Sequence, residues 1–327
     1  LHHIALARLQ QGPRDRRDPA HLPQSAVRLV DAQDGDLAFL AVLGVNIVGN
    51  QIMPHEEAAL ENFAYPIEAE PALRHIRPQL AGATYTAEDE SGDANQFARE
   101  LVKRCEHDGV QFLMSHTITA LREVGGEIDH VEATDSEGRF QRIKADAYVL
   151  AMGSLSPLYA KPLGIELPIY PAKGYSVTMP VKDARMAHQV SLTDDEYKLV
   201  FSRLGDRLRI AGTAELNGYD RDLNRVRCEA IVRRVEELFP GAGHLDQAQF
   251  WTGLRPATPS NVPIIGRSKV KNLFLNTGHG TLGWTHACGS GKSIARIVSG
   301  LQPEVNFAFT GLPKPSAAVP ALAASAH

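Results

Sequence analysis

One arginine lies in a stretch of the chain that is otherwise apolar and rich in proline. Arg255 occurs within WTGLRPATPSNVPIIG, residues 251–266, where it is the single charged residue. A buried guanidinium needs an anion, and its planar fork can bind a carboxylate through two parallel hydrogen bonds. Arg255 could therefore orient an amino acid or a hydroxy acid. The alternative is an internal ion pair with an Asp or Glu.

A second stretch places five glycines close together where a strand is expected to turn into a helix. The segment is NLFLNTGHGTLGWTHACGSGK, residues 272–292. Glycines let a backbone approach a flat ligand closely, and the amides of such a turn and of the helix start near Gly289 to Gly291 can donate to carbonyls or anions. This chemistry would suit the pyrimidine edge of a flavin. The alternative is a loop whose glycines serve packing alone.

Several other polar residues are weaker candidates. Tyr175 and Tyr197 could line a substrate pocket, although a lone tyrosine in a strand more often serves packing. His279 is a candidate flavin or substrate contact, with a solvated loop histidine as the alternative. We expect no metal, because Cys105 and His107 have no companion ligands at zinc spacing. The sequence has no GxSxG or HExxH motif, so a hydrolase is not expected.

The elements that must position these residues can be read from about residue 65 onward. Asp93 followed by Gln96 resembles a capping box and predicts a helix through QFARELVKRCEH. Three short strands should follow over residues 110–143. The apolar run of residues 147–152 then predicts a strand covered on both faces.

A second region, residues 168–251, predicts an antiparallel sheet. It contains the strand GYSVTMPV and a hairpin whose Gly-Asp turn lies at residues 205–206. One amphipathic helix is expected over residues 222–239, with Val226 on its apolar face. The chain should then return to the first domain with a strand at residues 272–276 and a helix at residues 290–301.

Composition limits the class of protein. The 327 residues suffice for two domains, and 34 Lys and Arg against 38 Asp and Glu leave no basic field for nucleic acid. Three isolated cysteines favour a reducing cytoplasmic compartment. The longest apolar run, residues 37–49, is shorter than the roughly 20 residues of a membrane-spanning helix, and no signal peptide is evident.

These segments together resemble D-amino-acid dehydrogenases of the small-subunit type, within the D-amino-acid oxidase and glycine oxidase superfamily of FAD proteins. The resemblance runs from about residue 65 to residue 311. It rests on DESGDANQFARELVKRC, KADAYVLAMGS, YPAKGYSVTMP, FWTGLRPATPSNVPIIGR and NLFLNTGHGTLGWTHACGSGK.

The resemblance implies an α/β and α+β fold, with a Rossmann-like FAD domain around a parallel sheet and a substrate domain on an antiparallel sheet. The expected limits are 63–164 with 255–312 for the FAD domain, 165–254 for the substrate domain, 1–62 unassigned, and 313–327 for a disordered tail.

The resemblance also assigns roles to residues. It implies that Arg255 binds the substrate carboxylate, that Ile118 lies near the adenine end of FAD, and that Gly153 ends an FAD-contacting strand. The turn against the isoalloxazine would consist of Gly278, His279, Gly280, Thr281, Leu282 and Gly283.

The implied reaction is oxidative deamination of a D-amino acid. Hydride would pass from Cα to flavin N5, the imino acid would hydrolyse to a 2-oxo acid and ammonia, and electrons would go to a quinone or another acceptor. No general base can be named from the sequence. We expect a cytoplasmic protein of bacterial type with peripheral contact to the inner face of a membrane.

The sequence departs from the family pattern at its start. The family opens with a GxGxxG unit that holds the FAD pyrophosphate. Here the nearest segment is GVNIVG, residues 44–49, with the wrong spacing. Three explanations for the missing unit are open. The chain is a truncated or frame-shifted product, a fragment of a longer chain, or one subunit whose partner supplies the unit, and the first is favoured. An inactive remnant or partner-dependent subunit, or an oxygen-using oxidase, are therefore alternative functions.

Overall fold

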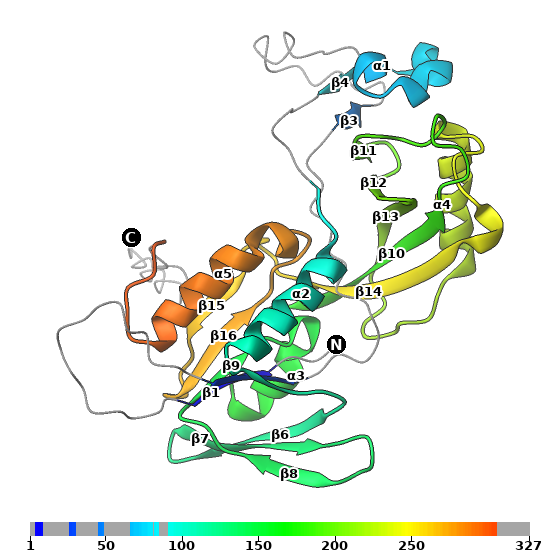
Figure 1. Ribbon diagram of the computed structural model, residues 1–327. Helices are drawn as coiled ribbons and strands as arrows, with labels where there is room; N and C mark the ends of the chain where they lie inside the picture. Colours follow the sequence, from blue (N-terminus) through cyan, green and yellow to red (C-terminus); the bar gives the residue numbers. More distant parts are fainter. Residues whose placement is uncertain are drawn as a thin grey trace, which may run out of the picture.

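Three β-sheets organise the described part of the chain in the computed structural model (Figure 1). The structure describes residues 4–8, 26–30, 45–48, 66–80, 82–84 and 91–305. The expected disordered tail, residues 313–327, lies outside these residues. The combination of an α/β part with an antiparallel part confirms the predicted fold class.

A six-stranded sheet has the order β15-β16-β9-β1-β2-β5. Its strands are Ile264–Arg267, Leu273–Thr277, Ala147–Leu150, Ile4–Arg8, Ala26–Val30 and Gln111–Leu113. The pair β9–β16 is parallel, as expected for the strand at residues 147–152, and the pair β2–β5, which the sequence did not predict, is parallel as well. The sheet as a whole is mixed, because β1 runs antiparallel to both of its neighbours and β15 runs antiparallel to β16.

Strand β9 is apolar throughout because both of its faces are covered. Ala147 and Val149 face the helix α5, Gly283–Val298, where Ile294 is buried with them. Tyr148 and Leu150 face the opposite way, into a cluster with the three-stranded sheet. That meander consists of β6 Thr117–Val124, β7 Glu127–Thr134 and β8 Phe140–Ile143. It confirms the predicted three-stranded meander, but the first predicted strand was too long, because residues 111–113 pair with β2 in the six-stranded sheet.

The helix α5 begins seven residues earlier than the sequence predicted. The expected start near Ser290 was wrong, and Gly289 and Gly291 lie inside the helix rather than at its amino terminus. Glycine disfavours a helix by only about 1 kcal/mol per residue, so tertiary packing can override it. Here Trp284 packs edge-on against Phe97, with ring centroids 5.4 Å apart.

Phe97 belongs to the helix α2, Ala94–His107, which confirms the capping prediction. The Asp93 side chain accepts hydrogen bonds from the amides of Asn95 and Gln96, both at 3.0 Å. The short helix α3, Ser156–Ala160, follows β9 and is flanked by 3₁₀ turns at Gly153–Leu155 and Lys161–Leu163.

A seven-stranded sheet has the order β14-β10-β13-β12-β11-β3-β4. Its strands are Gln249–Ala257, Tyr170–Pro180, Arg207–Glu215, Leu199–Leu204, Leu192–Asp194, Val45–Val48 and Gly82–Thr84. The hairpin of β12 and β13 turns at residues 205–206, as predicted. Val45–Val48 pairs with β11, so the middle of the GVNIVG segment belongs to this sheet and not to the sheet that holds β9.

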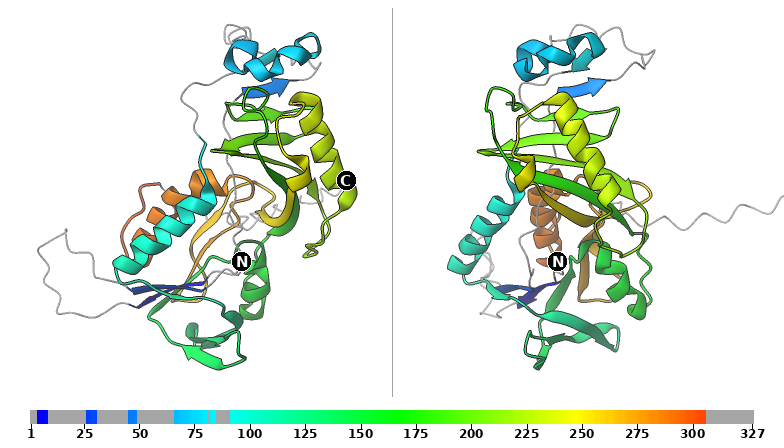
Figure 2. Two further views of the ribbon diagram at one scale, coloured as in Figure 1. Left: turned by 45° about the vertical axis from the view of Figure 1, so that its right-hand side comes forward. Right: turned by 90° about the vertical axis from the view of Figure 1, so that its right-hand side faces the viewer.

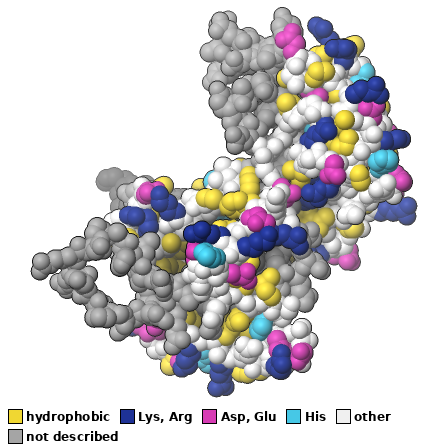
Figure 3. All heavy atoms as spheres, viewed as in Figure 1, with side chains coloured by type: hydrophobic (Ala, Val, Ile, Leu, Met, Phe, Trp, Pro, Cys, Tyr) yellow, Lys and Arg dark blue, Asp and Glu magenta, His cyan; other side chains and the backbone are white. Residues whose placement is uncertain are grey.

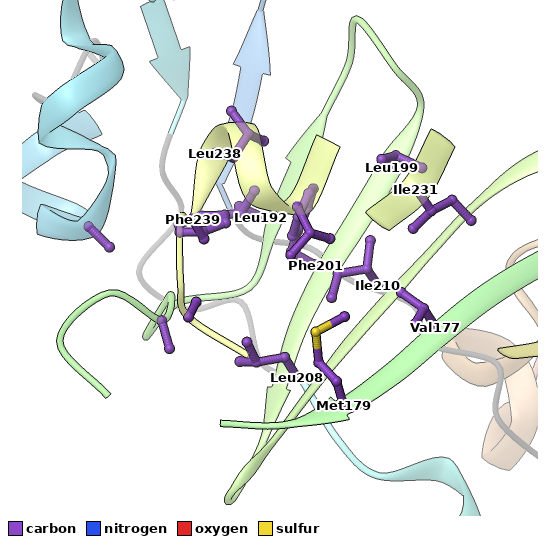
Figure 4. Close-up of a cluster of buried hydrophobic side chains, with 14 of the residues drawn as sticks. Val177, Met179, Leu192, Leu199, Phe201, Leu208, Ile210, Ile231, Leu238 and Phe239 are labelled. Carbon is purple, nitrogen blue, oxygen red and sulfur yellow. The ribbon is translucent and has the colours of Figure 1, made fainter. Parts of the chain in front are cut away.

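The helix α4, Arg225–Leu238, covers one face of the seven-stranded sheet (Figure 2). A hydrophobic core lies between the helix and the sheet. Figure 4 shows Phe201 and Ile210 of the sheet packed with Ile231 and Phe239 in this core. The helix confirms the prediction for residues 222–239. Its buried face begins at Cys228, whereas Val226, which was expected on that face, is 75% exposed. Val226 lies five residues before Ile231, and at about 3.6 residues per turn that spacing places the two side chains on different faces.

Residues 66–80 join the core of the seven-stranded sheet. They form the helix α1, Pro66–Ala69, and a 3₁₀ helix, Pro71–Gln79, that buries Leu73 and Ile76 in the cluster under α4. The buried Glu70 carboxylate accepts hydrogen bonds from the amides of Gln189 and Val190. The segment therefore packs with the sheet that carries residues 165–254, although the sequence placed it in the FAD domain.

Charge is mixed on the molecular surface. On the face shown in Figure 3, Lys and Arg side chains are interspersed with Asp and Glu side chains. None of the helices in the described part combines the length and apolar composition needed to cross a bilayer.

A buried histidine makes the stability of the fold depend on pH. His188 is fully buried between Phe201 and Phe239, and burial lowers its pKa from 6.5 to about 4. Between pH 6.5 and pH 4 the unfolded chain therefore binds more protons at this histidine than the folded chain does. The free energy of unfolding consequently falls as the pH falls from 6.5 through 4. The loss from this residue should reach about 3 kcal/mol.

Urea unfolding at pH 7.5 and pH 4.5 measures this effect. We expect His188→Leu to lose less stability between the two pH values than the parent does. An equal loss in both proteins would show that His188 contributes nothing to the pH dependence.

Candidate active site

A cavity of about 590 Å³ lies over the seven-stranded sheet, on strands β10, β12, β13 and β14. Its floor is built of small residues. These are Ala172, Gly174, Ala211, Gly212, Gly253 and Ala257. Gly280 and Thr281 of the glycine-rich turn line the same cavity, and the amide of Gly280 donates to the carbonyl of Pro256 at 3.0 Å. The cavity therefore brings the two sequence segments with predicted chemistry together.

Arg255 lines this cavity and lies flat across the backbone of β10. A Cβ added to Gly174 would meet the Arg255 guanidinium at 2.0 Å, so the absent side chain of Gly174 makes room for it. One guanidinium nitrogen, Nη1, donates to the carbonyl of Thr213 at 3.2 Å. Partial burial lowers the pKa of Arg255, because a charge that has less water around it is less stable. An anion in the cavity would restore that stabilisation.

An indole lies beside this guanidinium. A Cβ at Gly253 would meet the ring of Trp251 at 2.2 Å, and Gly253 pairs with Gly174 across β14 and β10. Because Gly174 and Gly253 have no side chains, the Arg255 guanidinium lies against the backbone of β10 and the Trp251 indole lies against the adjacent backbone of β14. Arg209 of β13 packs over the indole, 5.6 Å from the ring centroid.

The charged residues that line the cavity are all basic. They are Lys198, Arg209, Arg227 and Arg255, and no Asp or Glu belongs to the lining within the described part of the chain. Like charges close together raise the local potential for an anion. The cavity is therefore suited to a negatively charged small molecule.

The two tyrosines take different positions. Tyr197 is half exposed at the rim, where its ring packs on the guanidinium of Arg234 at 4.0 Å. Arg234 is in turn held by the buried carboxylate of Asp194, at 2.6 Å. Tyr175 is almost fully buried, and its hydroxyl donates to Glu215. Both residues line the cavity, but the Tyr175 hydroxyl already has a protein partner.

The glycine-rich turn between β16 and α5 suits the polar edge of a flavin. Gly278 and Gly280 adopt positive φ angles of 78° and 54°, and nothing lies within 4 Å of a Cβ placed at Gly280. The first residue before α5, Leu282, offers no side-chain cap, so the first amides of the helix remain available as donors. Gly283 begins the helix.

His279 supports the same interpretation. Burial, together with the nearby His286, lowers its pKa to about 4, so the ring is neutral at pH 7. Its Nε2 atom is buried and has no hydrogen-bond partner in the described structure. A buried polar atom without a partner is costly, and a ligand with a matching group would satisfy it.

Of the two remaining predicted FAD contacts, one lies near this turn. The carbonyl of Gly153 accepts a hydrogen bond from the Thr277 hydroxyl at the end of β16. A Cβ atom added to Gly153 would lie 3.9 Å from the ring of Pro256. Ile118 is buried in the cluster around the meander, and its carbonyl accepts from Tyr159 at 2.9 Å. Neither residue lines the cavity described above.

Sequence reasoning missed part of the site. Gly174 could have been found, because a glycine inside a strand often marks a close approach of another group. Trp251 and Thr213 carried no such signal. Their positions depend on strand register and on an irregularity in β13, which appear only in three dimensions.

The chain is similar to several known proteins. The DAO family, described as FAD dependent oxidoreductase, matches residues 45–297. A D-amino acid dehydrogenase of Dechloromonas aromatica is 54% identical over 243 residues, which cover 74% of this chain and 58% of that protein. A D-amino acid dehydrogenase of Paramagnetospirillum magneticum is 50% identical, covering 74% of this chain and 56% of that protein.

Solved structures share the fold at lower identity. Glycine oxidase from Geobacillus kaustophilus has a TM-score of 0.64 and 22% identity, covering 74% of this chain and 63% of that one. L-proline dehydrogenase from P. horikoshii has a TM-score of 0.63 and 17% identity, and the match covers 74% of this chain and 64% of that one. The chain thus spans somewhat more than half the length of the curated relatives. Since the family match covers most of its residues, the chain belongs to the DAO family of FAD dependent oxidoreductases.

Proposed function

We propose that this chain forms the substrate site of an FAD-dependent D-amino acid dehydrogenase, which deaminates D-amino acids oxidatively to 2-oxo acids and ammonia. The observation that carries the proposal is the Arg255 guanidinium, half-buried at the floor of a cavity that also touches the glycine-rich turn. The similarity to proteins named D-amino acid dehydrogenase supports the choice of substrate.

The residues of the chain act by orientation. Arg255 would hold the substrate carboxylate by a bidentate pair, and the small residues around Gly253 leave space for Cα and the side chain. Trp251 would bound the cavity on one side and Tyr197 would close its rim. Holding a substrate in one orientation at the turn is a large part of what a protein contributes to cofactor chemistry.

The turn would hold the cofactor edge nearest to the substrate. We assign this role to Gly278, His279, Gly280, Thr281, Leu282 and Gly283, with Gly153 beside them and Ile118 as the assignment farthest from the cavity. When bound, FAD supplies the acceptor for the hydride of Cα.

The electron acceptor follows from the same proposal. A quinone or another acceptor fits relatives that are named dehydrogenases. A cytoplasmic location with peripheral contact to the inner face of the membrane would bring the chain to such an acceptor, and a partner subunit could contribute to the assembly. The free state of Cys105, Cys228 and Cys288 agrees with a reducing compartment.

Anaerobic spectroscopy with two enantiomers tests the proposal. After FAD is added to the purified chain, saturable quenching of flavin fluorescence should report binding. D-Alanine should then bleach the visible absorption of the flavin, as expected for about one hydride per flavin, while L-alanine should leave it unchanged. Bound flavin that neither enantiomer bleaches would contradict the proposed reaction, and a chain that binds no FAD would favour an inactive remnant or a partner-dependent subunit.

A further inference from the structure

Strained backbone conformations gather around the cavity. Within the described part of the chain, four residues other than glycine have a positive φ angle, and three of them, Lys198, Thr213 and Asn261, line the cavity. Asparagine tolerates this conformation, but for a β-branched threonine it is a genuine outlier. Such strain persists where the surroundings or a function maintain it. Thr213 is therefore the residue that needs an explanation.

Thr213 occupies the position in a β-bulge that usually belongs to glycine. In the pairing of β10 with β13, Lys173 faces Glu215 and Tyr175 faces Gly212. Two residues, Thr213 and Ala214, therefore stand opposite the single residue Gly174. Thr213 is the first of the two and has a φ of 54°. This is the geometry of a bulge whose first residue is left-handed, a place that glycine fills without strain.

The bulge turns the backbone of Thr213 toward Arg255. The Thr213 carbonyl accepts the hydrogen bond from Arg255 Nη1 at 3.2 Å, directly beside the guanidinium that lies over Gly174. A glycine at position 213 could supply the same carbonyl. The backbone geometry alone therefore does not account for threonine at this position.

The side chain of Thr213 supplies the missing reason. Its Oγ1 atom is buried and has no hydrogen-bond partner within the described structure. Hydroxyl and methyl group share one carbon, so a rotation about χ1 exchanges the group that faces the cavity. A hydroxyl beside a carboxylate-binding guanidinium is a natural second donor to the same carboxylate.

We propose that Thr213 is a second carboxylate-binding residue, whose carbonyl orients Arg255 and whose hydroxyl donates to the ligand carboxylate. This inference rests on the proposed function of Arg255. The strain at Thr213 would then be retained because the hydroxyl is needed at that point of the bulge. Stability and binding should consequently respond in opposite directions when Thr213 is replaced by glycine.

Fluorescence of Trp251 can report binding directly, without FAD turnover. The sequence contains two tryptophans, so a Trp284→Phe background leaves Trp251, in the cavity wall, as the single indole. D-Alanine is titrated into this parent and into its variants, and each melting temperature is measured. The variants are Thr213→Gly, Thr213→Ser and, as a control left-handed residue outside the cavity, Ser115→Gly.

Thr213→Gly should melt no lower than the parent and bind D-alanine about tenfold more weakly, the scale of one hydrogen bond to a charged group. Thr213→Ser keeps the hydroxyl and should bind within about twofold of the parent. Ser115→Gly should leave binding unchanged. Parent-like binding by Thr213→Gly, or an equal loss in Thr213→Ser, would refute a role for the hydroxyl. A parent without saturable binding, or binding that ignores Arg255→Ala, would instead overturn the proposed function and this inference with it.

Discussion

Replacing Arg255 by alanine should weaken the binding of D-amino acids by about 100-fold relative to the parent, which a titration at high D-alanine concentration still measures. The guanidinium is the charge at the floor of the cavity whose hydration is reduced by burial, so an anionic ligand gains most there. Arg255→Lys should recover only part of the loss, because an ammonium cannot form the two parallel hydrogen bonds of a guanidinium. Titration of Trp251 fluorescence with D-alanine measures both variants.

A basic residue outside the cavity provides the control for charge. Arg207 lies on the same strand as Arg209, does not line the cavity, and pairs with Asp93 at 3.2 Å. Arg207→Ala removes one positive charge from the same sheet and should leave affinity within about twofold. If Arg255→Ala binds D-alanine as the parent does, the carboxylate is held elsewhere and the proposed site is wrong.

The sequence predicted those parts of the fold in which local signals agree with tertiary packing. Asp93 caps α2 as the capping pattern indicated, and the apolar run of β9 is covered on both faces. The start of α5 was misplaced because five glycines read locally as a turn. In the structure α5 begins at Gly283, and Trp284 in its first turn packs on Phe97.

The site likewise contains residues that the sequence predicted and residues whose role depends on tertiary structure. The sequence singled out Arg255 and the turn that contains Gly280 from residue type and spacing, and both line one cavity. Thr213 could not be found in this way, because its role depends on a bulge that is set by the register of β13 against β10. Register is a property of two strands distant in sequence, so no single segment encodes it.

Gly174→Ala should disable binding while leaving the fold almost as stable as before. The new methyl group would lie 2.0 Å from Arg255 Nη1 and 2.2 Å from its Cζ, which cannot persist. These atoms are the end of a flexible side chain, so the guanidinium moves rather than the sheet. We expect a loss of affinity for D-alanine of about tenfold or more and a loss of stability below about 1 kcal/mol. Fluorescence titration and urea unfolding measure the two quantities.

A control and a double variant separate displacement of Arg255 from other effects. Gly289→Ala adds the same methyl group where nothing lies within 4 Å, so affinity should not change. In an Arg255→Ala background the guanidinium is absent, and Gly174→Ala should then cause no further loss of binding. Double variants of two residues in contact are non-additive in this way when one acts through the other. Full additivity would mean that the methyl group at residue 174 obstructs the ligand itself, and Gly174 would then shape the cavity floor rather than seat the guanidinium.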